Sequence, residues 1–366
     1  MTVPTHHKAA LYSSPGNIAV ELEDVPTPTP GLGEVLVRLS HTGVCHSDLA
    51  VMTNSWAFLP FPIQPGQIGG HEGVGKIISV GPGIEVGGPK VGDRVGVKWI
   101  AQTCGGCVHC ISGDDVSCEG LKISGYYTPG TFQEYVIAKA NYVTPVPDGL
   151  ASEVAAPLLC GGVTVYSALK KTGARPGDYV VIPGCSGGLG HLGLQLGSRV
   201  FGFRMIGIDS GDKRSIAEEC GCELFFDINQ YKRDKAGSDE LAEDIKAATS
   251  DGKGATAVVV CTGSKAAYDQ AVSLLRVKGT LVCVGVPSND VTPIVGAEPG
   301  TLVAKQVKIV GSAVGNRLEA IETLEYAARG LIKTKVTVES LKSLGDVFQK
   351  MQKGQLHGRA VIDLSK

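Results

Sequence analysis

The C-terminal half of the chain alternates between short apolar runs and helix-forming segments, and this alternation constrains the fold more than any other feature. Helical patterns lie between most of the runs, and one of them is predicted over 264–276. Strands that alternate with helices in this way form a parallel sheet covered on both faces. The sequence therefore predicts an α/β fold with a doubly wound, six-stranded parallel sheet. The predicted strands cover 179–182, 205–209, 223–227, 257–261, 280–285 and 308–312.

The remainder of the chain has a different pattern. Short apolar alternations broken by glycine and proline predict strands at 34–40, 73–81, 93–99 and 132–138. After residue 313 the pattern predicts amphipathic helices at 317–330 and 339–354, then a strand at 359–365. We expect three parts. They are a β-rich domain (1–156), an α/β domain (157–313) and a segment that returns to the first domain (314–366).

Composition excludes several classes of partner. The net charge is −2, whereas nucleic acids and anionic membranes require a basic surface. No apolar run is long enough to span a bilayer, and no secretory signal is evident, so we expect a cytoplasmic protein. In that reducing compartment the eleven cysteines are better interpreted as thiols or metal ligands than as disulfides.

A glycine-rich turn between the first predicted strand of the sheet and the next helix resembles a dinucleotide fingerprint. In GCSGGLG (184–190) two glycines fit the G-x-G-x-x-G pattern, but Cys185 stands at its first position. Asp209 ends the next strand, where a carboxylate binds the adenosine ribose and repels a 2′-phosphate, which favours NAD. Nearby lysine and arginine keep NADP open. The candidate cofactor contacts here are Gly187, Gly188, Leu189, Gly190, Asp209 and Lys213.

The segment TCGGCVHCISGDDVSC (103–118) contains four cysteines with the spacing C-x2-C-x2-C-x7-C. Four thiolates this close can complete a tetrahedron around Zn²⁺ and leave no position for a substrate. The alternative is four free or disulfide-bonded thiols. The pattern predicts a structural zinc held by Cys104, Cys107, Cys110 and Cys118.

Three further motifs are scattered along the chain: GVCHSD (43–48), GGHEGVG (69–75) and LLCGG (158–162). Each alone is explained by an ordinary core or turn residue. Together, Cys45, His71 and Cys160 make a Cys₂His set that leaves a fourth position for water or substrate, as in catalytic zinc sites.

These motifs, in this order and with the closing GRAVIDLSK, resemble the zinc-dependent medium-chain alcohol dehydrogenases, closest to the fungal, yeast-type branch. The resemblance runs nearly end to end. It implies a GroES-like catalytic domain with a zinc lobe at about 98–120, a Rossmann NAD domain, and two zinc ions per chain. It also implies a homotetramer, with a homodimer as the alternative.

The resemblance assigns roles to further residues. Asp48 would orient the histidine ligand, Glu72 would stand behind the catalytic zinc, and Ser47 would relay the substrate proton. His46 and Arg359 would contact the cofactor pyrophosphate, and Trp56 and Trp99 would line the substrate pocket. Zinc would act as a Lewis acid on the alcohol oxygen while a hydride passes to the nicotinamide.

Three positions depart from the yeast-type pattern. Ala50 replaces the histidine that ends the proton relay, so we expect water to complete the relay or turnover at low pH to fall. The segment 57–70 is a few residues longer, and we expect it to reshape the pocket mouth. Cys185 replaces a small residue in the phosphate loop.

The leading hypothesis is an NAD-dependent zinc alcohol dehydrogenase for small or medium primary alcohols. One alternative is a pathway-specific dehydrogenase for a larger or aromatic alcohol or aldehyde. The other is a non-catalytic zinc and NAD(H) redox sensor that uses the five remaining cysteines. The sequence leaves the physiological substrate and direction open.

Overall fold

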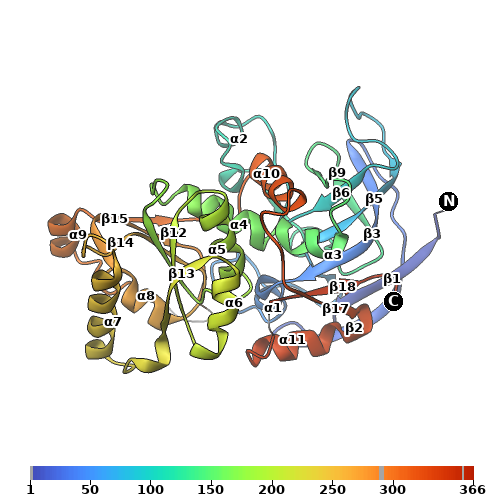
Figure 1. Cartoon of the computed structure of the whole chain (residues 1–366). Helices are drawn as coiled ribbons and strands as arrows, with labels where there is room; N and C mark the ends of the chain where they lie inside the picture. The colour runs from blue at the N-terminus through green and yellow to red at the C-terminus, as the bar shows by residue number, and fades with distance from the viewer. Residues whose placement is uncertain (1–2, 288–291, 357) are drawn as a thin grey trace. The chain divides into compact units, whose positions relative to one another are not determined.

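The computed structural model describes residues 3–287, 292–356 and 358–366. Its internal contacts divide the chain into two compact units, which are described separately (Figure 1). Unit 1 comprises Met1–Val163, Val314–Arg329 and Thr334–Lys366, and unit 2 comprises Thr164–Ala313 and Gly330–Lys333.

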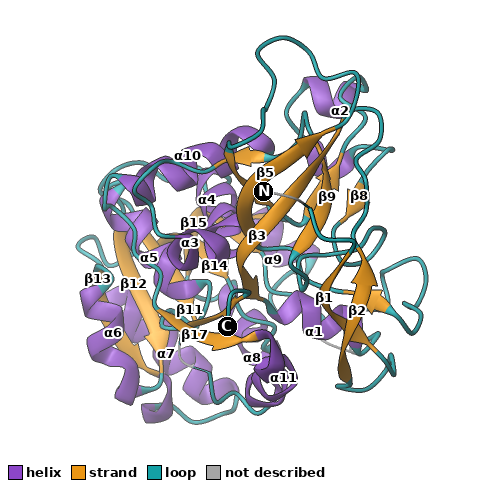
Figure 2. Ribbon diagram, turned by 90° about the vertical axis from the view of Figure 1, so that its right-hand side faces the viewer, coloured by secondary structure: helices purple, strands orange, loops and turns teal. Residues whose placement is uncertain are grey.

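Unit 1 is built from largely antiparallel sheets (Figure 2). The largest sheet has seven strands in the order β10-β6-β5-β3-β18-β17, with β9 also paired to β3, and the others are β2-β1-β4 and β7-β8. The strands are β1 (His6–Tyr12), β2 (Val20–Pro26), β3 (Glu34–Val44), β4 (Gln67–Ile68), β5 (Gly73–Val80), β6 (Arg94–Val97), β7 (Ile100–Gln102), β8 (Lys122–Ile123), β9 (Tyr135–Lys139), β10 (Thr144–Pro145), β17 (Val336–Ser340) and β18 (Arg359–Asp363).

Short helices connect these strands, and the buried side chains of both form one core around Tyr12, Phe132 and Phe348. The helices are α1 (His46–Met52), α2 (Val108–Ile111), η1 (Asp115–Ser117), α3 (Ser152–Ala155), η2 (Ala156–Leu159), α10 (Arg317–Ala328), η5 (Leu341–Ser343) and α11 (Leu344–Gln352). Helix α4 (Gly161–Lys170) begins in unit 1 and continues into unit 2.

The predicted helix at 339–354 is wrong in its first part. Residues 336–340 form strand β17, and the α-helix begins only at Leu344. Strand β17 pairs in parallel with β18, Glu339 opposite Ile362, and this long-range pairing overrides the local helical pattern.

Unit 2 contains a six-stranded parallel sheet in the order β13-β12-β11-β14-β15-β16. Its first strand along the chain lies in the middle of the sheet, as in doubly wound folds. The strands are β11 (Tyr179–Pro183), β12 (Arg204–Asp209), β13 (Cys222–Asp227), β14 (Ala255–Val260), β15 (Leu275–Cys283) and β16 (Lys308–Gly311).

Helices cover both faces of this sheet (Figure 1). One face packs on α7 and α8 through a core that includes Val181, Val258 and Leu241. On the other face α5 approaches closely, since a Cβ at its Gly193 would meet Ile182 at 2.7 Å. The helices are α5 (Gly190–Arg199), η3 (Gly211–Lys213), α6 (Arg214–Glu219), η4 (Ile228–Gln230), α7 (Lys235–Ala248), α8 (Lys265–Ala271) and α9 (Pro299–Lys305).

The predicted fold class is confirmed, with one local correction. The helix expected over 264–276 ends at Ala271, because Leu275 already pairs with Ala255 as the start of β15. Among the described residues no single helix has the length and apolar composition needed to cross a bilayer. Only the consecutive segments Ser152–Leu159 and Gly161–Lys170, bent by 49°, pass that test as a pair.

Candidate active site

Four candidate ligands from three distant segments of unit 1 converge in its interior. Cys45 follows β3, His71 and Glu72 precede β5, and Cys160 lies between η2 and α4. One donor atom from each lies within 4.8 Å of all the others, and all four residues are buried. The sulfur atoms of Cys45 and Cys160 are 3.9 Å apart. We call this set the buried cluster.

Asp48 connects two members of the buried cluster. It lies in the first turn of α1, where Oδ2 accepts the backbone N–H of Cys45 at 2.9 Å and Oδ1 lies 2.7 Å from His71 Nδ1. The other ring nitrogen, Nε2, is buried and has no hydrogen-bond partner among the described residues. A histidine held through Nδ1 presents Nε2 as a lone-pair donor, the usual arrangement at a metal.

One member of the buried cluster, Glu72, takes part in a buried ion pair. Arg359, from β18, pairs with Glu72, and its Nη1 donates to Cys45 Sγ at 3.9 Å. Burial raises the pKa of the Glu72 carboxyl to about 7, and the guanidinium opposes that rise. A Cβ at Gly43 would collide with the Glu72 carboxylate, so the backbone needs glycine there. Neither the pairing nor the need for Gly43 was anticipated from the sequence.

The two thiols of the buried cluster are not equivalent. Their mutual hydrogen bond lowers the pKa of Cys45 well below its ordinary value and raises that of Cys160. The positive charge of Arg359 favours a thiolate at both positions. Cys45 is therefore the thiol that ionises first, and the cluster as a whole offers two sulfur atoms, an imidazole and a carboxylate enclosed by protein, which are donor types that zinc accepts.

The remaining predicted residues of this region are placed as follows. Ser47 lies beside the cluster, with its hydroxyl 3.6 Å from Cys45 Sγ, whereas His46 is exposed at the start of α1. Ala50 is buried. Trp99 contacts His71 edge to face, with ring centroids 4.8 Å apart, and Trp56 contacts Trp99 at 6.2 Å.

The second cysteine set, the lobe cluster, comprises Cys104, Cys107, Cys110 and Cys118. The four sulfur atoms all lie within 4.8 Å of one another, and Cys104 is exposed. Backbone N–H groups of Gly106 and Cys107 lower the pKa of Cys104 to about 6. Burial and neighbouring thiols raise that of Cys110 to about 11.

The lobe is attached to the rest of unit 1 through Asp115, which lies between the third and fourth cysteines. Its Oδ2 accepts the Tyr142 hydroxyl at 2.7 Å and the backbone N–H of Arg317 at 3.0 Å. Lys98 lies over the Tyr142 ring, 3.7 Å from its centroid, and donates to the Tyr142 carbonyl. Burial lowers the pKa of Lys98 to about 7, although Asp115 opposes the shift. No sequence motif indicated this network.

In unit 2 the glycine turn connects β11 to α5. Asp209, at the end of β12, accepts the backbone N–H of Ser186 at 3.0 Å and the Lys213 ammonium at 3.1 Å. The predicted carboxylate thus lies against the turn. Gly190 is the first residue of α5. A Cβ at Gly190 would collide with the Gly184 carbonyl, so the close packing of the turn requires glycine at this position.

Cys185, the departure within this turn, is fully buried. Its sulfur lies over Gly207 of β12, where a Cβ would approach Cys185 Sγ at 2.7 Å and Cys222 Sγ at 2.8 Å. The larger residue at 185 is therefore accommodated by the missing side chain at 207. It does not add bulk to the exposed side of the turn.

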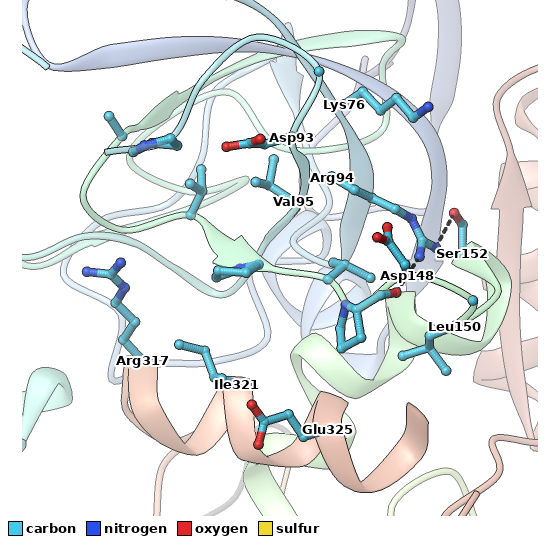
Figure 3. Close-up of a pocket in the computed structure, with 18 of the residues that line it drawn as sticks. Lys76, Asp93, Arg94, Val95, Asp148, Leu150, Ser152, Arg317, Ile321 and Glu325 are labelled. Atoms are coloured by element: carbon cyan, nitrogen blue, oxygen red, sulfur yellow. Dashed lines mark hydrogen bonds between the residues drawn. The ribbon is translucent and has the colours of Figure 1, made fainter. Parts of the chain in front are cut away.

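A hollow of about 1060 Å³ also opens in unit 1 (Figure 3). Helix α10 contributes Arg317, Ile321 and Glu325 to one wall. Arg94, in another wall, donates to Ser152 Oγ and to the Pro147 carbonyl, both at 2.9 Å. Its lining mixes both signs of charge and includes no member of either cluster, so the chemistry lies elsewhere.

Comparisons with known proteins agree with this geometry. Residues 31–148 match the alcohol dehydrogenase GroES-like domain, and residues 188–329 match the zinc-binding dehydrogenase domain. Alcohol dehydrogenase 2 of Emericella nidulans is 51% identical over 364 residues, 99% of each chain. The chain belongs to the zinc-dependent alcohol dehydrogenases. Another relative, the alcohol dehydrogenase of Schizosaccharomyces pombe, is 40% identical and matches over 100% of both chains.

Solved structures of related dehydrogenases have the same fold. The alcohol dehydrogenase of Aeropyrum pernix is 31% identical, with a TM-score of 0.85, over 98% of this chain and 100% of that one. Acetophenone reductase of Geotrichum candidum, solved in complex with NAD, is 28% identical, with a TM-score of 0.84, over 100% and 99%. The predicted class, an NAD-dependent zinc alcohol dehydrogenase, is confirmed, and the redox-sensor alternative is set aside.

Proposed function

We propose that this alcohol dehydrogenase interconverts small or medium primary alcohols and their aldehydes, with NAD as hydride acceptor and the buried cluster as its zinc site. Oxidation moves a hydride from the alcohol carbon to the nicotinamide ring and releases the hydroxyl proton. The products are the aldehyde, NADH and one proton.

The observation that carries the proposal is the convergence of the donor atoms of Cys45, His71 and Cys160 within 4.8 Å, together with Glu72. Two thiols and one imidazole are ligands that zinc prefers, and three of them leave a position for substrate. The orphaned Nε2 of His71 fits the same role, since a buried nitrogen without a partner is costly. Zinc held there supplies a Lewis acid for the substrate oxygen.

The chain's own groups position ligands and move the proton. Asp48 fixes the His71 ring through Nδ1. Ser47, 3.6 Å from Cys45 Sγ, is placed to accept the substrate's hydroxyl proton and pass it on. Arg359 pairs with Glu72, and its positive charge favours thiolates at Cys45 and Cys160.

We assign cofactor binding to the turn and carboxylate of unit 2. Asp209 would bind the adenosine ribose, and its negative charge disfavours NADP. Lys213 pairs with that carboxylate and so offers less of its charge to a 2′-phosphate. We also propose that Gly187 to Gly190, His46 and Arg359 contact the cofactor pyrophosphate. We propose further that the chain divides into a catalytic domain (1–156 with 314–366) and an NAD domain (157–313).

We further propose that the lobe cluster holds a second, structural zinc. Its four sulfur donors fill a tetrahedron and leave no open position. The two tryptophans beside His71 would narrow the substrate site and so favour primary over bulky secondary alcohols. By resemblance to the yeast-type branch we expect a cytoplasmic homotetramer, with a homodimer as the alternative, which analytical ultracentrifugation distinguishes.

The test is absorbance at 340 nm with purified protein, NAD⁺ or NADP⁺, and primary alcohols from ethanol to cinnamyl alcohol. The proposal expects NADH formation from ethanol and weaker turnover with NADP⁺. Turnover of long or aromatic alcohols alone would favour the pathway-specific alternative. Zinc-loaded protein that acts on no alcohol and no aldehyde would contradict the proposal.

A further inference from the structure

A row of aromatic rings extends outward from the buried cluster within unit 1. Its first contacts, from His71 to Trp99 and on to Trp56, are edge to face. The row then continues to Phe58, whose ring centroid lies 5.2 Å from that of Trp56 at an interplanar angle of 33°. Exposure increases along the row, from fully buried at His71 to 63% at Phe58.

Local hydrogen bonds hold Phe58 in this row. The backbone N–H of Leu59 bonds to the Trp56 carbonyl at 3.1 Å, and this tight turn folds Phe58 back towards Trp56. Farther along, the Tyr126 hydroxyl bonds to both the N–H and the carbonyl of Phe61. The segment is fixed at two points, so the exposed ring is held in a defined position.

Phe61, three residues on, offers an internal comparison. It is the same residue type and is 47% exposed. However, its ring stacks on Tyr126 at 4.9 Å and meets Tyr127 at 5.5 Å. The Phe61 ring therefore packs on the two tyrosines, whereas the Phe58 ring extends the row that begins at His71.

We infer that Phe58 is a specificity-determining residue that binds the distal apolar end of long or aryl-tailed primary alcohols and aldehydes. The inference rests on the proposed function and names part of its substrate range. Phe58 is three ring contacts away from His71, so a short alcohol does not reach it and a long one does. The exposed face of the Phe58 ring lies next to the partly buried Trp56. Apolar substrate atoms that cover this face are removed from water together with it, and this burial stabilises the bound substrate.

The test compares Phe58→Ala and Phe61→Ala in the full-length zinc enzyme with NAD⁺. Steady-state kinetics are measured with ethanol and with 6-phenyl-1-hexanol. An aromatic contact of ordinary strength predicts that Phe58→Ala raises the ratio of KM for 6-phenyl-1-hexanol to KM for ethanol about threefold to tenfold. Phe58→Leu, which keeps an apolar side chain, raises it less. Phe61→Ala leaves the KM ratio within about twofold of wild type, a change smaller than the lowest value expected for Phe58→Ala.

A second readout does not depend on turnover. The chain has only two tryptophans, and both belong to this row. Their emission should change as 6-phenyl-1-hexanol is added to the zinc-loaded protein without cofactor, where no turnover occurs, with a half-saturation point that Phe58→Ala shifts by a similar factor. This titration still tests the inference if the wild-type enzyme turns over no alcohol, an outcome that would count against the proposed function alone.

Three outcomes overturn the inference. The first is an unchanged KM ratio in Phe58→Ala together with unchanged half-saturation in the emission titration. The second is an equal effect of Phe61→Ala, which would assign the effect to the segment as a whole. The third is a changed elution volume of Phe58→Ala on size-exclusion chromatography, which would assign the exposed ring to a contact between copies.

Discussion

The two cysteine clusters use the same ligand chemistry but are built in opposite ways. The lobe cluster comes from one short segment, includes an exposed sulfur and is attached through Asp115. The buried cluster joins segments up to 115 residues apart, and Asp48 and Arg359 contact its members. A set of four sulfur ligands stabilises a loop, whereas an open set enclosed by charged groups can hold and activate a substrate.

The largest expected effect is on turnover when the buried cluster loses a ligand. Cys160→Ser keeps the shape of the side chain but removes the thiolate that zinc prefers. We expect kcat/KM to fall by at least about 10³-fold, because the Lewis acid accounts for several kcal/mol of transition-state stabilisation. Kinetics with ethanol and NAD⁺ measure this. Activity within tenfold of wild type would remove Cys160 from the site.

Removing the hydrogen bond that orients His71 should have an intermediate effect. Asp48→Asn retains the size of the side chain but loses the charge 2.7 Å from His71 Nδ1. Loss of such partners typically lowers metal affinity or activity about 10–100-fold. Competition with a zinc-binding dye measures the affinity and kinetics measure the activity. If both stay at wild-type values, Asp48 does not position the ligand.

Loss of a ligand from the lobe cluster should affect stability more than turnover. Cys107→Ser is expected to lower the melting temperature by about 10 °C, because a structural zinc contributes folding free energy. The kcat of protein that keeps its catalytic zinc should stay within about threefold. Scanning calorimetry and kinetics on the same sample give both values. A large fall in kcat at an unchanged melting temperature would contradict the assignment.

The last expected effect is on stability alone and concerns Lys98, which lies over the Tyr142 ring. Its pKa is lowered to about 7 in the folded protein from an ordinary value of 10.5. Between these pH values the unfolded chain binds more protons, so this group makes stability rise with pH and penalises folding most below about pH 7. The advantage of Lys98→Met over wild type should therefore be greatest near pH 7 and shrink by a few kcal/mol towards pH 10.

Urea unfolding of both proteins at a series of pH values measures that difference. Lys76→Met, at an exposed position on β5, is the control for removing one positive charge. A difference between Lys98→Met and wild type that does not vary with pH would mean that the lysine stays charged in the folded protein.

The same contrast explains how far the sequence alone could lead. The lobe cluster and the parallel sheet depend on local spacing and periodicity, so both could be predicted. The pairing of Glu72 with Arg359 joins residues 287 positions apart, and no local pattern records it. Strand β17 and the early end of α8 were missed because strand pairing overrode helical patterns. The fit of Cys185 over Gly207 depends on neighbouring strands, which a single motif does not describe.

The most direct test of the account is the zinc content of the wild type, Cys160→Ser and Cys107→Ser, measured by mass spectrometry of the metal after exhaustive dialysis. The account predicts two zinc ions per wild-type chain and one in each variant, with NADH production lost only in Cys160→Ser. One zinc ion in the wild type, or two retained in either variant, would contradict the division into a catalytic and a structural site.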